Sequence, residues 1–150
     1  MSKVPKTKRV TDPHCDAVYS WEQEWLDWNR NRLGITACRK LIRRACRWYK
    51  VPYPTVVHHN CKELSYSVPE VGYVSLQGGK PHKEGGRNVA TAMHEAAHHI
   101  GWHLRGENIQ DHGPFFIGLY IALLVRAKVA PEIAITSTAK AHGLKWKRHT

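Results

Sequence analysis

Aromatic and charged residues in the first third of the chain recur with the spacing of an amphipathic helix. Tyr19 begins a series of Trp and Leu residues that ends at Trp28, with acidic and basic side chains between them. The pattern occupies residues 16–32, and Gly34 follows as a stop signal. We therefore expect a first helix over this segment.

A second helix is predicted over residues 38–50, where apolar and cationic residues separate completely. Thr36 is a suitable N-cap, and Pro52 and Pro54 follow as stop signals. At about 100° per residue, apolar side chains fall on one arc and cations on the other. The apolar arc holds Cys38, Leu41, Ile42, Ala45, Cys46, Trp48 and Tyr49, and the cationic arc holds Arg39, Lys40, Arg43, Arg44, Arg47 and Lys50. The first arc must face a core, whereas the second can follow a phosphate backbone or simply remain solvated.

The middle of the chain has the residue types of a small sheet. Three short runs rich in β-branched and aromatic residues occupy 55–58, 64–67 and 71–76. They predict three strands in an antiparallel or mixed sheet. Two glycine pairs then bracket a predicted loop over residues 78–86.

Three further helices are predicted after this loop. Residues 88–103 are rich in helix-forming Ala, Met and Leu. Pro114 suits the first turn of a helix that continues through the strongly apolar residues 115–128. A last helix is expected over 131–142. Together with the sheet, these helices predict an α+β fold.

Length and composition predict one domain. A chain of 150 residues with 42% hydrophobic content can bury one substantial core. Residues 1–13 carry four cations, two prolines and almost no apolar side chains, so we expect a flexible basic arm there. The single domain is then expected over residues 14–150.

The charge is strongly positive and unevenly distributed. Lys and Arg number 23 against 12 acidic residues, for a net charge of +11. Residues 1–50 carry 12 basic and 5 acidic side chains, whereas residues 51–100 carry 4 of each. This excess predicts a polyanionic neighbour such as DNA or another nucleic acid. The candidate contacts on the cationic arc are Arg39, Lys40, Arg43, Arg44 and Arg47.

The cysteines and the longest apolar run indicate a cytoplasmic protein without a membrane segment. None of the four cysteines forms a C-x-x-C pair, and the polar, basic start of the chain does not resemble a secretory signal. The longest nearly uninterrupted apolar run, over 115–125, is about half of the roughly 20 residues that span a bilayer. We expect Cys38 and Cys46 to be buried thiols.

The strongest chemical signal is an H-E-x-x-H motif in a segment predicted to be helical. His94 and His98 are separated by about 400° around the helix, so both imidazoles can reach one Zn²⁺ ion. Glu95 lies about 100° further round from His94. A carboxylate there stays outside the zinc ligands but can act as general base on a zinc-activated water.

A catalytic zinc takes three protein ligands, and the third has three candidates. His103 misses by one residue the spacing of the longer H-E-x-x-H-x-x-G-x-x-H motif. Glu107 lies in a predicted loop that no regular helix orients. We favour His112, because the Gly-Pro sequence after it begins a rigid apolar helix.

This order of elements and motifs resembles the SprT-like zinc metalloprotease domain, the family that includes Spartan. The resemblance covers residues 36–128 and rests on H-E-A-A-H at 94–98 and D-H-G-P-F-F at 111–116. It implies a compact zincin-like fold and a zinc metalloendopeptidase with one Zn²⁺ per chain, held by the two motif histidines and His112. Residues 129–150 contain no Cys-rich zinc ribbon, so the resemblance does not by itself imply a role in the repair of DNA–protein crosslinks.

The resemblance also implies how a protein or peptide substrate would bind and be cleaved. In such enzymes a strand beside the catalytic helix pairs with the substrate backbone, and residues 71–76 would take this place. The predicted substrate contacts are Val71, Gly72, Tyr73 and Val74. Glu95 would take a proton from the zinc-activated water and later deliver it to the leaving amine. Tyr73, Tyr120 and His99 are open candidates for stabilising the oxyanion.

Two other function classes are compatible with the sequence. One is a non-enzymatic, basic nucleic-acid-binding protein with a structural zinc site, and the other is a latent protease that acts as a scaffold. A structural site would be closed by a fourth ligand and would not require Glu95. The sequence offers no obvious fourth ligand, which favours the peptidase.

Overall fold

The computed structural model describes residues 15–26, 33–59, 65–77, 88–106 and 112–148. The predicted basic arm and the glycine-bracketed loop lie outside these residues. The described part contains the helices α1 (Cys15–Leu26), α2 (Ile35–Tyr49), α3 (Val89–Arg105), α4 (Pro114–Arg126) and α5 (Glu132–Ala141), the strands β1 (Thr55–His59), β2 (Tyr66–Val68) and β3 (Tyr73–Gln77), and the 3₁₀ helix η1 (Pro69–Val71). The predicted α+β class is confirmed, and helices predominate.

The three strands form a mixed sheet with the order β1-β3-β2. β1 runs parallel to β3, and β2 runs antiparallel to it. The antiparallel pair follows from the short connection through η1, because Gly72 adopts a left-handed conformation (φ 64°) and donates its N–H to the Pro69 carbonyl. The chain reverses direction there and enters β3.

The strand predicted over residues 71–76 is wrong in extent, while the substrate contacts expected at Val71, Gly72, Tyr73 and Val74 stay a prediction. Val71 ends η1 and Gly72 forms the turn, so only Tyr73 and Val74 belong to β3. β3 is the central strand, and both of its edges are hydrogen-bonded over these two residues, to β1 and to β2. It therefore has no free edge there for a substrate backbone. The β-branched Val71 suggested a strand, but the turn formed by Pro69 and Gly72 decides the local structure.

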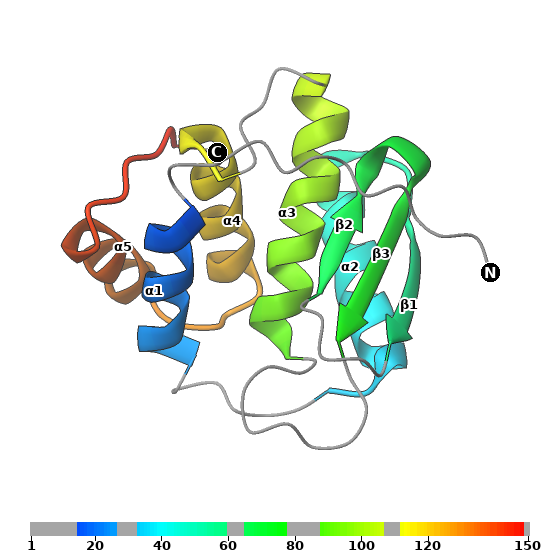
Figure 1. The fold of residues 1–150 in the computed structure, drawn as a ribbon, viewed down its shortest axis with the longest axis horizontal. Helices are drawn as coiled ribbons and strands as arrows, with labels where there is room; N and C mark the ends of the chain where they lie inside the picture. Colours follow the sequence, from blue (N-terminus) through cyan, green and yellow to red (C-terminus); the bar gives the residue numbers. More distant parts are fainter. Residues whose placement is uncertain (1–14, 27–32, 60–64, 78–87, 107–111, 149–150) are drawn as a thin grey trace.

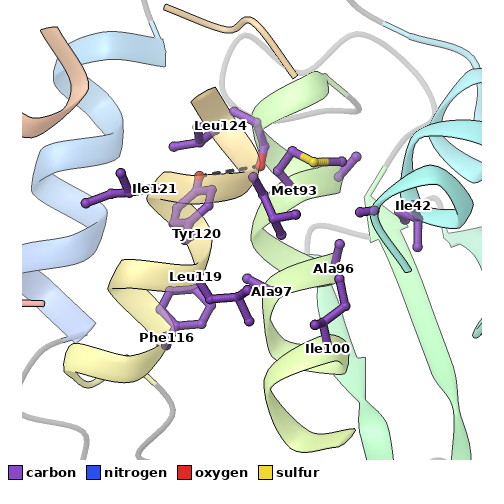
Figure 2. Close-up of a cluster of buried hydrophobic side chains, with 14 of the residues drawn as sticks. Ile42, Met93, Ala96, Ala97, Ile100, Phe116, Leu119, Tyr120, Ile121 and Leu124 are labelled. Carbon is purple, nitrogen blue, oxygen red and sulfur yellow. Dashed lines mark hydrogen bonds between the residues drawn. The ribbon is translucent and has the colours of Figure 1, made fainter. Parts of the chain in front are cut away.

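Helix α3 crosses the middle of the molecule, with α1, α4 and α5 on one side and the sheet and α2 on the other (Figure 1). Small residues on two faces of α3 allow neighbouring helices to pack closely. Figure 2 shows Ala97 turned toward Leu119 of α4, while Ala96 lies on the side that faces Ile42 of α2. All four side chains are fully buried. This packing holds the H-E-x-x-H helix rigidly on both sides.

Helix α2 has the predicted apolar arc but begins earlier than predicted. Gly34 occupies the N-cap position, and Thr36 is an exposed residue of the first turn rather than the cap. The helix ends at Tyr49, where Lys50 adopts a left-handed conformation before the two prolines. The residues of α2 that are fully buried are Cys38, Ile42, Ala45 and Cys46. Both thiols are buried, as predicted.

Helix α1 is attached to the C-terminal half of the chain through one fully buried tryptophan. The indole Nε1 of Trp21 donates a hydrogen bond to Thr138 Oγ1 of α5 at 2.9 Å, and its ring meets the Tyr120 ring of α4 edge-on. Pro114 stands in the first turn of α4, as predicted. No helix among the described residues has the length and apolarity of a membrane span.

Candidate metal centre

Three histidines converge where α3 packs against the start of α4. His94 and His98 lie one turn apart on α3, and His112 lies two residues before Pro114. The Nε2 atom of His94 is 3.2 Å from that of His98 and 3.3 Å from that of His112. One ligand atom from each ring lies within 4.8 Å of the others, so the three histidines can hold a metal ion.

Local sequence signals place each of these side chains. Asn88 caps α3, because its Oδ1 accepts a hydrogen bond from the Thr91 N–H at 2.8 Å. The regular helix that follows puts His94 and His98 on one face. Gly113 caps α4, and its carbonyl accepts from the Ile117 N–H at 3.0 Å, which fixes the turn that carries His112.

His103, one of the other two candidates for third ligand, lies away from this cluster. The ring of His103 lies against His99 and Trp102, with centroid distances of 4.6 and 5.1 Å. Glu107 lies outside the described residues. The group of potential ligands found in the described part of the chain thus contains the two motif histidines and His112.

Aromatic rings surround the three imidazoles. The fully buried Phe116 stacks on His98 at a centroid distance of 4.4 Å and an interplanar angle of 23°. It also meets His94 and His112 at 5.2 and 5.0 Å. Tyr19 of α1 lies 6.2 Å from the His94 ring and 5.8 Å from that of His112. The rings limit the orientations that the imidazoles can adopt.

A carboxylate from α1 contacts the metal centre and was not predicted from the sequence. Glu22 Oε1 lies 3.0 Å from His94 Nδ1, and Glu22 Oε2 accepts a hydrogen bond from the Tyr120 hydroxyl at 3.0 Å. Glu22 is only 7% exposed to solvent. The sequence did contain a signal that Glu22 is buried. Glu22 lies one residue after Trp21 and four after Val18, which puts it on the apolar face of a predicted helix.

Burial and neighbouring charge shift the pKa values of the histidines in opposite directions. Burial alone would lower the pKa of His94, but the Glu22 carboxylate and, to a smaller extent, that of Glu95 raise it to about 9. The pKa of His98 falls well below its ordinary value, because its ring is desolvated and lies beside His94 and His112. Desolvation, reinforced by Glu22, raises the pKa of the Tyr120 hydroxyl.

Glu95 lies in the same buried region but is not one of the clustered ligands. It is 4% exposed, and its Oε2 has no hydrogen-bond partner among the described residues. Desolvation raises the pKa of its carboxyl group to about 7, with attraction by His94 opposing the shift and repulsion by Glu22 adding to it. A buried carboxylate with an unpaired oxygen, close enough to His94 for their charges to interact, fits a centre that receives a metal ion and its water.

Two of the three candidates for stabilising the oxyanion have other partners. The hydroxyl of Tyr120 is bonded to Glu22 and lies 3.4 Å from the Ala90 carbonyl oxygen (Figure 2). The Nε2 atom of His99 lies 2.7 Å from the Pro52 carbonyl oxygen, to which it donates. Tyr73 packs its ring against Tyr66 within the sheet, at 6.3 Å.

The cationic arc of α2 is exposed, with one exception. Lys40, Arg43, Arg44 and Arg47 face solvent. Arg39 is partly buried, and its Nε donates a hydrogen bond to the Val56 carbonyl at 2.9 Å, so it braces α2 against β1. The predicted stripe is therefore shorter than the sequence indicated.

The fold and centre were also compared with known proteins. Models of protein families, curated proteins and solved structures each gave no match to this chain. The functional proposal therefore depends on the arrangement of the side chains themselves.

Proposed function

We propose that the protein is a zinc-dependent metallopeptidase with a zincin-like arrangement of helix and sheet, similar to the SprT-like family. One observation carries the proposal: the Nε2 atoms of three histidines converge, and the residue that follows the first of them is a buried glutamate. This combination supplies both a metal site and a general base within one centre.

The donor set favours zinc in an open, catalytic site. Imidazole nitrogens suit zinc, and catalytic zinc sites use three protein ligands. A structural site needs a fourth ligand, and the clustered group in the described structure contains only His94, His98 and His112. A zinc ion bound there would act as a Lewis acid toward the scissile carbonyl and lower the pKa of a water molecule.

Glu95 is suited to moving the proton that hydrolysis requires. The attacking water loses a proton to the Glu95 carboxylate as its oxygen adds to the carbonyl carbon. The same proton then passes from Glu95 to the amine nitrogen as the C–N bond breaks. Burial, which raises the pKa of this carboxyl group above its ordinary value, favours its accepting the proton from water.

The test is to compare the wild type with Glu95→Gln and with Glu70→Gln, a matched change at an exposed carboxylate of η1. Zinc content and cleavage of casein are measured on the same samples. We expect Glu95→Gln to keep its zinc and to cleave casein roughly 10²–10⁴-fold more slowly than the wild type. Glu70→Gln should behave as the wild type. Cleavage by Glu95→Gln at the wild-type rate would remove Glu95 from the role of base.

A second activity, binding of nucleic acid, is favoured by the exposed cations of α2. This helix contains no acidic residue, so Arg43, Arg44 and Arg47 present an uncompensated positive face. The guanidinium of Arg43 lies 5.9 Å from the ring centroid of Tyr53, which is 51% exposed and can stack on a base. We propose that this face binds single-stranded DNA or RNA and brings the peptidase to proteins on nucleic acid. Without peptidase activity, the same face would make the chain a nucleic-acid-binding protein with a structural metal.

The nucleic-acid proposal is tested by fluorescence anisotropy with labelled single-stranded DNA over a range of salt concentrations. Replacing Arg43, Arg44 and Arg47 with Ser should reduce the slope of log affinity against log salt by about 2, at roughly 0.7 per lost phosphate contact. A control removes three exposed cations of α5 and the segment that follows it, Lys140, Lys145 and Lys147. An equal reduction of this slope in the two variants would show that net charge alone, and not this face of α2, determines the binding of DNA.

A further inference from the structure

We infer that Glu22 is a positioning residue of the metal centre, which makes α1 part of the machinery that binds the metal. This inference rests on the metal site of the proposed function. Glu22 lies outside both ligand motifs, on a helix that comes far before them in the sequence. The inference follows from three contacts: Glu22 with His94, Glu22 with Tyr120, and Trp21 with Thr138.

The first contact decides which nitrogen of His94 is available to a metal. Glu22 Oε1 lies 3.0 Å from His94 Nδ1 as an ion pair, so in the neutral imidazole that a metal binds, the carboxylate favours the proton on Nδ1. The lone pair is then on Nε2. That same Nε2 lies within 3.3 Å of the Nε2 atoms of His98 and His112. Glu22 therefore selects the tautomer and ring orientation that metal binding needs.

The second contact holds the carboxylate itself in place. Glu22 Oε2 accepts from the hydroxyl of the fully buried Tyr120 at 3.0 Å. Tyr120 belongs to α4, and its ring also meets that of His94 at 5.2 Å. Glu22 thus bridges a residue of α3 and a residue of α4. A buried carboxylate that bonds to Tyr120 through one oxygen and contacts His94 through the other has little freedom to leave His94.

The third contact fixes α1 without involving the metal ligands. Trp21 is next to Glu22 in sequence, is fully buried and bonds to Thr138 of α5. Because this anchor lies on a different helix from the histidines, the position of Glu22 is set before any metal binds. The centre is therefore preorganised, and weakening the carboxylate should lower metal affinity even when the protein remains folded.

The experiment measures the zinc dissociation constant of the full chain by competition with a chromophoric chelator. The variants are Glu22→Gln, Glu22→Ala and Tyr120→Phe, and circular dichroism checks their folding. The matched control is Thr138→Val, which removes the hydrogen bond between Trp21 of α1 and Thr138 of α5 but leaves the fully buried Trp21 ring and Glu22 in place. The visible spectrum of the Co²⁺-loaded proteins reports the geometry of the ligands directly.

We expect Glu22→Ala to weaken zinc binding by roughly 10–100-fold, the usual effect of losing such a partner of a metal-bound histidine. Glu22→Gln should lose less, because its amide oxygen still accepts from Nδ1–H, and its Co²⁺ spectrum should stay closer to that of the wild type. Tyr120→Phe should show a smaller loss and provides a test if Glu22→Ala does not fold. Thr138→Val should lower the melting temperature but leave the zinc affinity within about threefold of the wild type.

Zinc binding by the folded Glu22 variants as tight as in the wild type would overturn the inference. An equal loss of affinity in Thr138→Val would also overturn it, because docking of α1 would then explain the whole effect. A wild type that binds no zinc would refute both this inference and the proposed function. A wild type that depends on Glu22 for zinc affinity but cleaves no protein would support the inference and count against the peptidase.

Discussion

Phe116 provides the most quantitative test of how the histidines are held. Its ring is fully buried, stacks on His98 at 4.4 Å and touches the rings of His94 and His112. Phe116→Ala removes this ring from the core, and such truncations cost about 3–5 kcal/mol of unfolding free energy. Phe116→Leu keeps most of the apolar volume, and we expect it to cost about 1 kcal/mol.

The leucine variant should nevertheless bind metal less tightly. Leucine offers no flat surface to His98, and an aromatic pair contributes about 0.5–1.5 kcal/mol beyond burial. If this contribution holds the His98 ring in the orientation that binds metal, its loss corresponds to a zinc affinity about 2–10-fold weaker. The matched control is Phe115→Leu, since the ring of Phe115 lies under the guanidinium of Arg105 at 4.7 Å rather than in the histidine cluster.

Two assays read out these effects separately. Urea unfolding in the presence of a chelator gives the stability of the metal-free protein, and chelator competition gives the zinc affinity. A cost below about 1 kcal/mol for Phe116→Ala would refute the packing argument, because fully buried rings cost several times more. Unchanged zinc affinity in Phe116→Leu would show that the stacked ring does not order His98.

Two further predictions concern helices α2 and α3. Burial raises the pKa of the Cys46 thiol from 9.0 to about 12. As the pH rises, the thiol therefore loses its proton in the unfolded state before it does so in the folded state. Between these two pKa values the free energy of unfolding should fall by about 1.4 kcal/mol per pH unit. Urea unfolding from about pH 8 to about pH 10.5 should therefore show a narrowing stability gap between wild type and Cys46→Ala, and a constant gap would contradict the burial. Asn88→Ala should cost about 1 kcal/mol through loss of the α3 cap, with zinc affinity unchanged. A measured cost near zero would mean that the Asn88 side chain does not cap the helix.

The parts of the structure that follow from local sequence were predictable. The spacing of His94 and His98, the Gly-Pro start after His112 and the two prolines after α2 act through nearby residues. Each fixes a backbone conformation or a helix face within one or two turns. The helices α2 to α5 therefore came out close to their predicted bounds, whereas the end of the first helix, predicted at residue 32, lies outside the described residues. The two ligand motifs pointed to the three histidines that cluster.

The parts that depend on distant contacts were missed or misplaced. The central position of β3 depends on which strand pairs with which, and the strand sequences do not encode that order. Arg39 looked like one more surface cation until its bond to Val56 was known. Glu22 meets Tyr120 across 98 positions of sequence, so only the packing of α1 against α4 reveals its place beside His94.

The most direct test of the central claim is the zinc stoichiometry of purified wild type, His112→Ala and His103→Ala, measured by elemental analysis. His103 is the matched control, because it is a histidine of α3 whose ring lies away from the cluster. We predict one zinc per chain in the wild type and in His103→Ala, and a sharp loss in His112→Ala. No zinc in the wild type, or full zinc in His112→Ala, would contradict the three-histidine centre.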